Sequence, residues 1–567
     1  MKKIVRILPV IMMIAAFSCI VDDITVKTDS IAIENPAGSA TIKIGETLNA
    51  TVTIAPVNAT DQTFTLKSSD GTVATVVKKN SDQCCGVYDI TITAAGAGTC
   101  NISAETANGK THSIVVTVQP NVTRVTVTAD NAERNYWLDE PAEFTFTVNP
   151  PLAPGDAFTG KLSREAGTAV GKYDITQGSL SAGTHYEITF VKGEFEIYYF
   201  RGEGTSGNPY KIFSPKQLRG WADDFVNKSV APYANAGVYF QLTEDMDLSA
   251  YKEGEGWMPI GIDPTNPFKG NFDGNGKIVK NLSINRPAGT YQGLFGCIAV
   301  GGMVKSLALI ADNLTSNGYP GGLAGYNFGA IENCNATITG NFNSNTTIGG
   351  LVGRSDGSVK SCYVILTGNI IGSINNNGNV GGVVGTSNGT VENCYVIGTG
   401  TVSSSNNTDI LMTGVGGVVG NVMGGTLRYS YAAVNVSGVV NVGGVVGRMS
   451  GSGRTENCVA LNSRIERTSG TSTTFGRVSG TTGSIANNVA WDGIKVNGTT
   501  VTGGTATNTH GADMEKADAK LQATYEALGW KFGTTDAAPW QMGTGNYKLP
   551  IFYWQTTDSA PMPDHLE

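Results

Sequence analysis

The stretch Ile348-Gly349-Gly350-Leu351-Val352-Gly353 decides the fold, because close copies of it recur along the chain. Each copy is a pair of glycines, two small or apolar residues and a third glycine. The second glycines of successive copies are 28, 32, 35 and 27 residues apart. Repetition at a period of roughly 20–50 residues is typical of solenoids and other repeat proteins. The copies occupy residues 321–325, 349–353, 381–385, 416–420 and 443–447, with degenerate ones at 293–296 and 475–480.

A second repeated position is a cysteine that follows the second glycine by twelve residues in three copies. The residue before it is often asparagine, which tolerates the left-handed backbone conformation of turns. We predict one coil per repeat, with about seven coils stacked at ~4.8 Å, on the order of 34 Å in all. The glycines would permit positive φ or close backbone approach. The position is held by Leu307, Cys334, Cys362, Cys394, Ser430, Cys458 and Asn488.

These repeats resemble the GLUG motif, which is named for its Gly-Leu-x-Gly core. Upstream segments at 242–248, 257–261 and 268–276 fit the same family, as do Gly529-Trp530 and Leu549-Pro550. The resemblance implies a parallel β-solenoid of the kind found in bacterial surface and secreted proteins, adhesins and some IgA-specific metallopeptidases. In repeat proteins, insertions often form the binding face. The variable segments expected to bulge from one side are 341–347, 375–379 and 403–408.

Short helices are expected at both ends of the solenoid. Ser214 is a predicted N-cap with Pro215 at the first helical position. One face of this helix would be apolar and would cover the open end of the solenoid, whose strand edges otherwise invite aggregation. A second helix, from about Ala512 to Leu528, is predicted to cap the far end. The apolar face of the first helix consists of Leu218, Trp221, Ala222, Phe225 and Val226.

Two β-rich segments precede the solenoid. Residues 24–118 alternate in short strands that suggest a β-sandwich, and segments 44–47, 54–62 and 73–76 resemble a bacterial Ig-like domain of group 2. Residues 119–198 resemble MBG-type repeats, chiefly through 169–175 and 186–190. Both resemblances imply spacer domains of surface proteins.

The amino terminus reads as a targeting segment. Lys2, Lys3 and Arg6 precede an apolar run at 7–16 that is too short to cross a bilayer as a helix. The run ends in Ala-Phe-Ser-Cys at 16–19, which looks like a bacterial lipobox and implies cleavage before Cys19 and acylation of that residue. An ordinary signal peptide with an incidental cysteine is the alternative.

The acidic pair Asp22-Asp23 resembles the surface-export signal of Bacteroidetes lipoproteins. We therefore expect a protein of a Gram-negative bacterium, lipid-anchored at Cys19 in the outer membrane and facing the cell exterior. Several acyl chains would hold it on the membrane, because each buried CH₂ contributes ~0.8 kcal/mol.

Composition and cysteine spacing narrow the function classes. A formal net charge of −8 argues against nucleic acid as a partner. The cysteines form no CxxC pair and no zinc-type cluster, so we predict no metal and no cofactor. A Cys85–Cys100 disulfide is compatible with the cell surface. The alternative is that Cys100 packs inward beside Ile102.

Parallel β-helices also include polysaccharide lyases and glycosidases, so an enzyme is the main rival. Glycoside hydrolysis typically needs two carboxylates within roughly 5–10 Å. Glu332, Glu392 and Glu456 hold equivalent turn positions and are expected to stack on the outside of the solenoid. GxSxG occurs at 353–357 and 385–389, but each copy leads into a strand, whereas a nucleophile elbow leads into a helix.

Three further observations bear on catalysis and metal binding. No HExxH occurs, so the sequence offers no metallopeptidase motif. The cysteine column is expected to act as small apolar groups inside a narrow solenoid. Asp245, Asp247 and Asp273 are expected to stabilise turns rather than to bind Ca²⁺, which requires six or more oxygens. No catalytic residue is predicted.

The sequence thus predicts an all-β adhesin-like protein whose solenoid presents loops to a host or environmental glycan or glycoprotein. A β-helix polysaccharide lyase or glycosidase, and a purely structural stalk or surface-assembly subunit, are the alternatives. The predicted divisions are a lipoprotein signal peptide (1–18), a tether and Ig-like domain (19–118), an MBG-like domain (119–198), the start of the solenoid with its N-terminal cap (199–290), the GLUG-repeat solenoid (291–490) and a C-terminal cap and tail (491–567).

Overall fold

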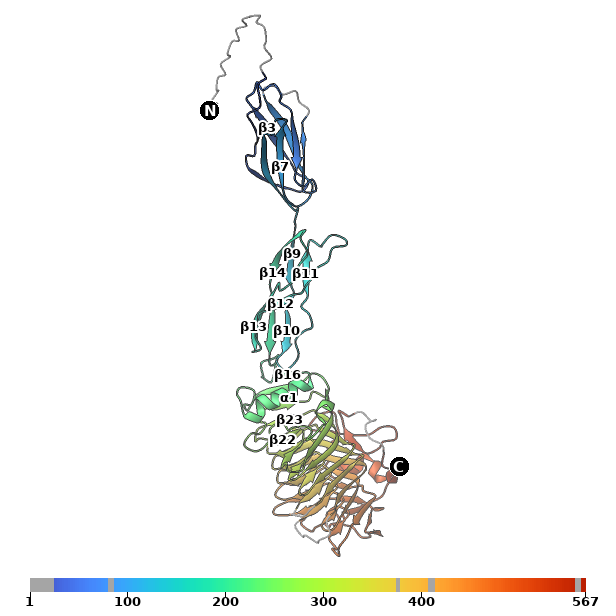
Figure 1. Ribbon diagram of the computed structural model, residues 1–567. Helices are drawn as coiled ribbons and strands as arrows, with labels where there is room; N and C mark the ends of the chain where they lie inside the picture. The colour runs from blue at the N-terminus through green and yellow to red at the C-terminus, as the bar shows by residue number, and fades with distance from the viewer. Residues whose placement is uncertain (1–24, 80–85, 374–377, 406–412, 556–561) are drawn as a thin grey trace, which may run out of the picture. The chain divides into compact units, whose positions relative to one another are not determined.

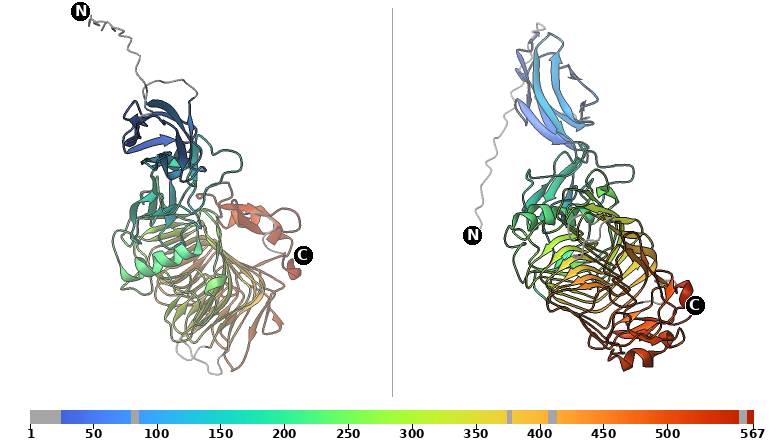
Figure 2. Two further views of the ribbon diagram at one scale, coloured as in Figure 1. Left: turned by 45° about the horizontal axis from the view of Figure 1, so that its top comes forward. Right: turned by 90° about the horizontal axis from the view of Figure 1, so that it is seen from below.

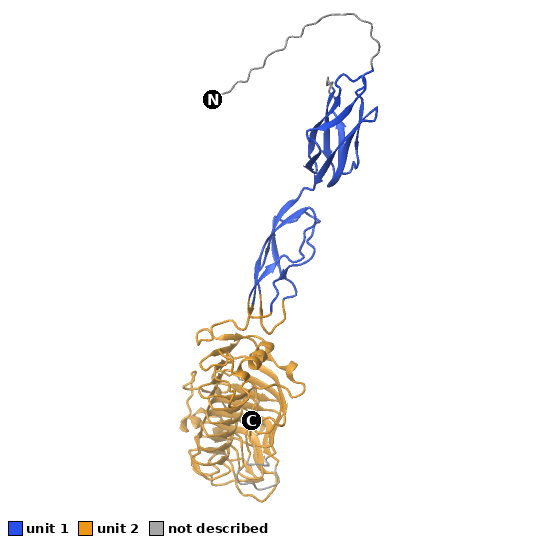
Figure 3. Cartoon of the chain, turned by 60° about the vertical axis from the view of Figure 1, so that its left-hand side comes forward, with its two compact units in different colours: residues 1–132, 141–167, 172–196 blue, residues 133–140, 168–171, 197–567 orange. Residues whose placement is uncertain are grey.

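The computed structural model describes residues 25–79, 86–373, 378–405, 413–555 and 562–567. Cys19, the lipobox, Asp22-Asp23, Cys84 and Cys85 lie outside these residues. The chain forms two compact units (Figure 3). Unit 1 comprises 1–132, 141–167 and 172–196, and unit 2 comprises 133–140, 168–171 and 197–567.

The strands between Ser30 and Gln119 of unit 1 form a sandwich of two four-stranded sheets (Figure 1). Alternate residues of the strands point inward, so that Ile, Val and Ala from both sheets share one core. Cys100 and Ile102 are both buried in that core. The predicted disulfide partner of Cys100 is among the residues that are not described. The sheets are β1 (Ser30–Glu34), β3 (Thr47–Ala55), β6 (Val87–Ala94), β5 (Ala74–Lys78); and β2 (Ser39–Lys43), β8 (Thr111–Gln119), β7 (Gly98–Thr106), β4 (Phe64–Ser68).

The segment predicted to be MBG-like folds into short strands. β14 runs parallel to β9, whereas β11 pairs with β9 in the antiparallel sense. The strands, in sheet order, are β11 (Phe146–Asn149), β9 (Thr123–Ala129), β14 (Tyr186–Val191); and β10 (Ala132–Asn135), β15 (Gly193–Tyr198), β13 (Gly171–Thr176), β12 (Ser163–Arg164).

Unit 2 is built around a parallel β-solenoid of about nine turns, in which each coil contributes strands to several faces (Figures 1 and 2). The stack is taller than the seven coils predicted, because it starts upstream of the glycine repeats. Tyr239 already pairs in parallel with Asn271, and Asn271 with Met303. The region expected only to lead into the solenoid therefore supplies coils of its own.

The largest sheet of the solenoid contains β16 (Tyr210–Ile212), β17 (Tyr239–Leu242), β18 (Met246–Asp247), β19 (Asn271–Asp273), β20 (Ile278–Arg286), β23 (Met303–Lys305), β24 (Ala308–Ser316), β27 (Ala330–Glu332), β28 (Asn335–Ile338), β29 (Asn341–Ser344), β32 (Ser358–Leu366), β33 (Asn369–Gly372), β36 (Thr390–Ser404), β39 (Thr426–Arg428), β40 (Tyr431–Gly438), β43 (Arg454–Glu456), β44 (Val459–Ala460), β45 (Arg464–Arg467), β47 (Ser484–Ala486), β48 (Val489–Trp491), β49 (Lys495–Val496), β50 (Thr499–Thr500) and β51 (Ala512–Met514).

The smaller sheets of unit 2 carry the glycine repeats and the C-terminal hairpin. They are β22 (Phe295–Ile298), β26 (Ala324–Asn327), β31 (Val352–Ser355), β35 (Val384–Ser387), β38 (Val419–Val422), β42 (Val446–Met449); β30 (Ile348–Gly349), β34 (Asn379–Gly381), β37 (Gly414–Gly416), β41 (Val442–Gly443), β46 (Phe475–Gly476); β21 (Tyr291–Gln292), β25 (Tyr319–Pro320); and β52 (Trp540–Met542), β53 (Pro550–Phe552).

The second glycine of each repeat is needed for close approach between coils and not for its backbone angle. A Cβ built on Gly350, Gly382 or Gly417 would lie 2.2, 1.9 or 2.0 Å from the carbonyl oxygen of the corresponding glycine in the next coil. None of these glycines has a positive φ. Of the two roles predicted for the repeat glycines, close approach is therefore the one that applies here.

The left-handed conformation occurs instead at the turn before the cysteine column. Seven residues there have φ between 52° and 57°. Asparagine is the common residue because it adopts this conformation at low cost. The residues are Ser306, Asn333, Ser361, Asn393, Tyr429, Asn457 and Asn487.

The cysteine column lies inside the solenoid, as predicted. Cys334, Cys362, Cys394 and Cys458 are fully buried within the main hydrophobic core. Each thiol donates to the backbone carbonyl two residues earlier, at 3.1–3.3 Å. Burial raises the pKa of Cys394 and Cys458 to about 12, which favours the uncharged thiol.

The first end of the solenoid is covered by α1 (Pro215–Asp224) (Figure 1). Ser214 caps it as predicted, because its hydroxyl accepts from the backbone N–H of Gln217. Trp221 is fully buried, with its ring 4.3 Å from that of Phe240 and 5.8 Å from that of Phe268. The predicted apolar face thus packs on the first coils.

The far end is closed by a buried arginine and by the segment that leads into β51. Arg477 occupies the second-glycine position of the last repeat and is fully buried. Its guanidinium forms an ion pair with Asp513 and donates to the carbonyl oxygens of His510 and Gly511 at 3.1 and 3.2 Å. These contacts hold residues 510–513 across the last coil.

The C-terminal region differs from the predicted end cap. The only α-helix within the predicted range 512–528 is α2 (Gln522–Ala527), which is accompanied by a 3₁₀ turn at Asp518–Lys520. Tyr525, Trp530 and Trp540 pack on outward-facing residues of several coils, including Tyr395 and Tyr431. Residues 514–555 and 562–566 therefore cover one flank of the solenoid (Figure 2). The remaining 3₁₀ turns are Val226–Lys228, Ser249–Tyr251 and Asp564–Leu566.

Stacked residues just before the left-handed turn alternate in charge from coil to coil. The glutamates predicted to stack do occupy equivalent positions in their coils. A lysine or an arginine, however, lies between each carboxylate and the next one. Ion pairs join Asp273 to Lys305 at 3.5 Å and Glu392 to Arg428 at 3.2 Å. We call this the charge column. Its members in coil order are Asp273, Lys305, Glu332, Lys360, Glu392, Arg428 and Glu456.

Within the described part of the chain, no helix has the length and apolar character needed to span a bilayer.

Replacing Gly382 by alanine is expected to destabilise the solenoid, because the new methyl group would meet the Gly417 carbonyl. Overpacking of this kind costs about 1–3 kcal/mol in the free energy of unfolding. The urea midpoint of the full chain measures it. Gly207→Ala is the matched control, since a Cβ there meets nothing within 4 Å. Equal effects of the two substitutions would contradict the close-approach role.

Lys360→Glu is expected to place three carboxylates next to one another in the charge column, with Glu332 and Glu392. Like charges directly opposite each other on neighbouring strands destabilise, so we expect a loss of about 1 kcal/mol relative to Lys360→Gln. Urea unfolding at low salt and at about 1 M salt checks the cause, because salt screens exposed charges. A difference that persists unchanged at high salt would show that repulsion is not responsible.

Candidate functional site

A groove lined mainly by polar residue types lies at one corner of the solenoid and has a volume of about 430 Å³. One side of it is a column contributed by β26, β31, β35, β38 and β42. In this column Tyr326, Arg354, Thr386, Asn421 and Arg448 pair in register on successive coils. We call it the corner groove, and it is lined by Tyr319, Thr347, Arg354, Asn379, Thr386, Asn421, Met423, Arg448, Ser450 and Gly451.

The floor of the corner groove is made of buried polar side chains. Thr347, Asn379, Thr386 and Asn421 are each at most 6% exposed. The Asn379 amide donates to the Thr386 hydroxyl at 3.0 Å, while the Asn379 side-chain carbonyl has no hydrogen-bond partner among the described residues. An unpaired buried acceptor is costly. The floor therefore contains hydrogen-bonding capacity that the described protein groups do not use.

A cluster of aromatic rings adjoins Tyr319, which is the aromatic residue among those that line the corner groove. The rings of Tyr291 and Tyr319 stack at 6.0 Å, and those of Tyr326 and Phe328 at 4.0 Å. The Arg354 guanidinium lies 5.0 Å from the centre of the Tyr326 ring. Half-exposed aromatic faces next to polar groups suit ligands that have both apolar and hydroxyl surfaces.

A small network fixes the orientation of these groups. The Tyr326 hydroxyl donates to Asp356 at 2.6 Å, and Arg354 forms an ion pair with the same carboxylate at 3.2 Å. Burial, together with the hydrogen bond to Asp356, raises the pKa of Tyr326 well above its usual value. The tyrosine therefore remains a neutral hydrogen-bond donor at physiological pH.

The sequence offered carboxylates for glycoside hydrolysis, and the structure separates them. Neighbouring members of the charge column lie on successive coils, at the ~4.8 Å spacing of adjacent strands. A lysine or arginine lies between Glu332 and Glu392, and another between Glu392 and Glu456. None of these glutamates lines the corner groove. Glu332 and Glu392 are thus two coils apart, ~9.6 Å at the strand spacing, but Lys360 lies between them and Glu392 is paired with Arg428.

The two GxSxG segments are turns between strands. Ser355 ends β31 and is fully buried, and its hydroxyl donates to the Gly357 carbonyl at 3.3 Å. Ser387 ends β35 and donates to Gly389 at 3.1 Å. Each segment leads into another strand, so neither serine is presented as a nucleophile.

The candidate calcium ligands accept hydrogen bonds from protein groups: Asp273 and Asp247 do so within their own turns, whereas Asp245 contacts the neighbouring coil. Asp245 accepts from the backbone N–H of Ile278 at 2.9 Å. Asp247 accepts from the Asn281 amide at 2.7 Å, and this bond contributes most to lowering the pKa of Asp247. Asp273 accepts from the N–H of Asn275 at 2.8 Å. Among the described residues, no group of three or more His, Cys, Asp or Glu could hold a metal ion.

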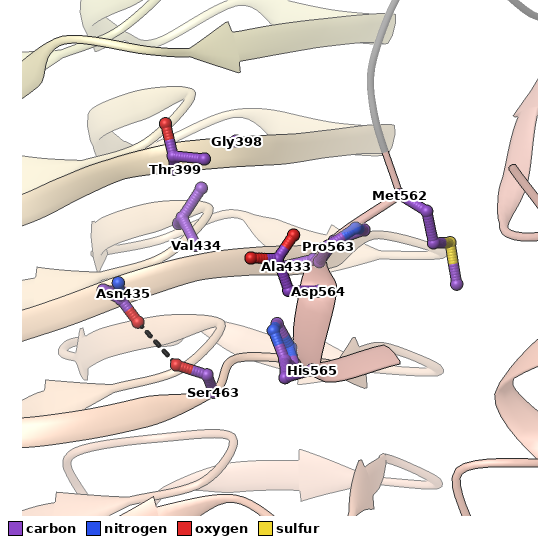
Figure 4. A pocket seen from close by; sticks show the side chains of 10 residues that line it. All are labelled: Gly398, Thr399, Ala433, Val434, Asn435, Ser463, Met562, Pro563, Asp564 and His565. Atoms are coloured by element: carbon purple, nitrogen blue, oxygen red, sulfur yellow. Dashed lines mark hydrogen bonds between the residues drawn. The ribbon is translucent and has the colours of Figure 1, made fainter. Parts of the chain in front are cut away.

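A second hollow, of about 320 Å³, lies where residues 562–565 meet the flank of the solenoid (Figure 4). It contains Ser463, Asp564 and His565, the residue types of a hydrolase triad. Ser463 and His565 hydrogen-bond to other groups instead. Ser463 donates to the Asn435 side chain at 2.8 Å, and the His565 ring nitrogen Nε2 lies 2.7 Å from the Leu461 carbonyl. The His565 contact attaches the C-terminal residues to the coils, whereas the Ser463 bond joins two neighbouring coils.

Sequence reasoning missed the corner groove, although the signal was present. Its column lies four residues after the second glycine of each repeat, at Tyr326, Arg354, Thr386, Asn421 and Arg448. The residue types differ at every step, so the position did not appear as a repeat. The binding face was expected in the variable segments instead. Two of those segments lie partly outside the described residues, and 341–344 forms β29.

The folded protein is expected to lose stability as the pH falls below about 6.5. Burial lowers the pKa of His510 and of His565 from the usual value of 6.5. The unfolded chain therefore takes up these protons first, so the stabilisation is complete above pH 6.5 and is lost as the pH falls through the lower folded-state values. Urea midpoints, followed by tryptophan fluorescence between pH 7 and pH 5, measure the slope.

The double variant His510→Gln/His565→Gln should flatten that slope, whereas His185→Gln, at an exposed site, should not. An unchanged slope in the double variant would assign the pH dependence to other groups.

Two family models match the chain. Residues 125–196 match the MBG domain (YGX type), within the segment predicted to be MBG-like. Residues 316–339 match the GLUG motif, and this range includes the first full glycine repeat and Cys334.

Similar proteins cover the repeats only in part. A "Putative Gly-rich membrane protein" of Evansella cellulosilytica is 40% identical over 154 residues, which are 26% of this chain and 17% of that protein. Halomucin of Haloquadratum walsbyi is 28% identical over 255 residues, 41% of this chain and 3% of that protein. The chain spans less than a fifth of the length of either relative.

Among solved structures, a "putative immunoglobulin A1 protease from Bacteroides ovatus" is 24% identical, with a TM-score of 0.43. The match covers 63% of this chain and 95% of that one. On the family matches and the observed coils, the chain carries an MBG domain of the YGX type followed by a GLUG-repeat β-solenoid.

Proposed function

We propose that the protein is a cell-surface binding protein whose solenoid binds a glycan or glycoprotein in the corner groove. The observation that carries this proposal is the combination of a buried polar floor, the half-buried Tyr319 and two arginines in one depression. Convergent polar groups with adjacent aromatic surface are typical of small-ligand sites. The sandwich and the MBG domain serve as spacers in this proposal.

Location at the cell surface is part of the same proposal. Acylated Cys19 would hold the chain in the outer membrane, facing the exterior. The name of the Evansella relative includes membrane, which agrees with a surface location. Because this chain spans only a small part of either relative, their names support the location without defining a ligand.

A polysaccharide-cleaving enzyme is the less favoured reading. The separation of the glutamates by Lys360 and Arg428 works against a carboxylate pair. Asp356, the carboxylate nearest the groove residues in sequence, is occupied by Tyr326 and Arg354. Release of reducing or unsaturated ends from a polysaccharide panel, lost in Asp356→Asn or Glu392→Gln, would support the enzyme instead.

Binding of the full chain to glycan and matrix-glycoprotein arrays tests the proposal. Tyr319→Ser should weaken the affinity for any ligand found by roughly tenfold, since truncating a central aromatic contact typically costs more than 1 kcal/mol. Tyr239→Ser is the matched control, because Tyr239 is half-buried on β17 and does not line the groove. Binding to no array component, or equal losses in both variants, would overturn the proposal and favour a structural stalk.

A further inference from the structure

The outward column that follows the cysteine column by one residue changes character along the solenoid. In three successive coils it consists of Tyr363, Tyr395 and Tyr431, whose stacked rings lie beneath the C-terminal cover, residues 514–555 and 562–566. In the three preceding coils the equivalent residues are smaller, and they are Ile278, Ala308 and Asn335. The column therefore loses its rings at the step from Tyr363 to Asn335.

A hollow of about 520 Å³ lies at this step, and we call it the Trp554 hollow. The C-terminal cover contributes Tyr553 and Trp554 to its wall, and the coils contribute the outward residues of the smaller part of the column. Volumes of ~300–1,000 Å³ are typical of small-ligand sites. The Trp554 hollow and the corner groove have no lining residue in common.

The aromatic part of the wall is anchored in the cover. The Trp554 ring stacks on Phe552 at 5.2 Å and lies 5.8 Å from the Tyr363 ring. Its indole N–H is buried and has no hydrogen-bond partner among the described residues. An aromatic side chain presents an apolar face with a polar edge, which suits a ligand that has both kinds of surface.

Asp536 fixes two more groups of the lining. Its carboxylate accepts from the Tyr553 hydroxyl at 3.0 Å and from the Asn333 amide at 3.2 Å. These bonds join the C-terminal cover to a coil beside the hollow. The wall is therefore positioned before any ligand arrives, which reduces the ordering cost of binding.

The coils supply polar groups that the protein does not use. Within the described ranges, neither the Asn335 side-chain amide nor the Ser306 hydroxyl forms a hydrogen bond with another residue, and both groups line the Trp554 hollow. An amide and a hydroxyl can each donate and accept. The hydroxyl groups of a sugar do the same, so the two sets of groups match.

The Trp554 hollow has little net charge. Among the described residues that line it, Asp273 is the single charged one. Its carboxylate accepts from the backbone N–H of Asn275 at 2.8 Å and forms an ion pair with Lys305 at 3.5 Å. A ligand of this hollow is therefore expected to be neutral.

We propose that the Trp554 hollow binds a single neutral pyranose residue of a glycan. One C–H face of the sugar ring packs against the rings of Tyr553 and Trp554, and its hydroxyls bond to Asn335 and Ser306. An aromatic peptide side chain would fill the space but would leave both polar groups unpaired. This site goes beyond the proposed function, because it is separate from the corner groove.

The test is saturation-transfer NMR of the full chain with methyl β-glucoside and methyl β-galactoside, followed by titration for Kd. The C–H protons of one ring face are expected to receive the strongest transfer. N-acetyl-tryptophanamide serves as the comparison probe for an aromatic peptide side chain. Its displacing the glycosides, or binding where they do not, would overturn the sugar assignment.

Asn335→Ala should weaken glycoside affinity by roughly three- to tenfold, the scale of one or two neutral hydrogen bonds. Thr337→Ala is the matched control, because Thr337 is the next outward residue of β28, is equally half-buried and does not line the hollow. Equal affinities of the two variants would overturn the assigned contact with Asn335.

Ala308→Tyr should abolish binding by a different route, since it extends the stacked rings into the hollow and removes no contact. Thermal melts of this variant and of Asn335→Ala show whether each is folded. Transfer to the glycosides in Ala308→Tyr equal to that of the unsubstituted chain would place the binding elsewhere and overturn the inference.

The corner-groove variant Tyr319→Ser separates the two sites. It should leave the glycoside affinity of the Trp554 hollow unchanged, because Tyr319 does not line it. A loss of glycoside binding in Tyr319→Ser but not in Ala308→Tyr would overturn the inference and support the corner groove. Binding of neither glycoside would overturn the inference alone, since the array experiment tests the corner groove independently.

Discussion

The distance between the backbones of neighbouring coils sets every other feature of the solenoid. At the glycine pairs, a carbonyl of one coil occupies the space where a side chain of the previous coil would lie. This contact brings the coils into parallel register, and the register then creates the columns of equivalent side chains. The buried cysteines, the left-handed turns, the charge column and the corner groove all depend on it.

The sequence predicted those parts of the fold that repeat with the same residue type. The glycine pairs, the cysteines and the asparagines before them are alike from copy to copy, so their positions in the coil followed directly. The apolar residues around Trp221 likewise predicted a helix, one face of which must pack against another element. Features built from unlike residues were harder to find. The glutamates of the charge column were identified, but the lysine and arginine between them were missed. A cation at the equivalent position of a repeat does not resemble a glutamate, so the column did not appear as a repeated residue.

Tertiary context decided the remainder. Nothing in residues 512–528 distinguishes a cap on the last coil from a cover on the flank, since both would bury Tyr525. The flank is chosen because Tyr363, Tyr395 and Tyr431 stack with their rings 4.7–5.0 Å apart and present an apolar outer surface to Trp530 and Trp540. The last coil is closed by Arg477. This arginine occupies a position that is glycine in the other repeats, so the sequence did not indicate that its side chain is buried. The groove follows the same pattern, because its lining comes from coils that are separated by about thirty residues each.

The charge column also constrains how such a chain can change its length during evolution. Removing a single coil, for example the one containing Lys360, would place Glu332 directly against Glu392. Removing two consecutive coils would restore contact between opposite charges. Tandem repeats of this kind are therefore expected to be gained and lost more readily in pairs than singly. The segment gained or lost in one event would then be two coils, although the structural repeat is one coil.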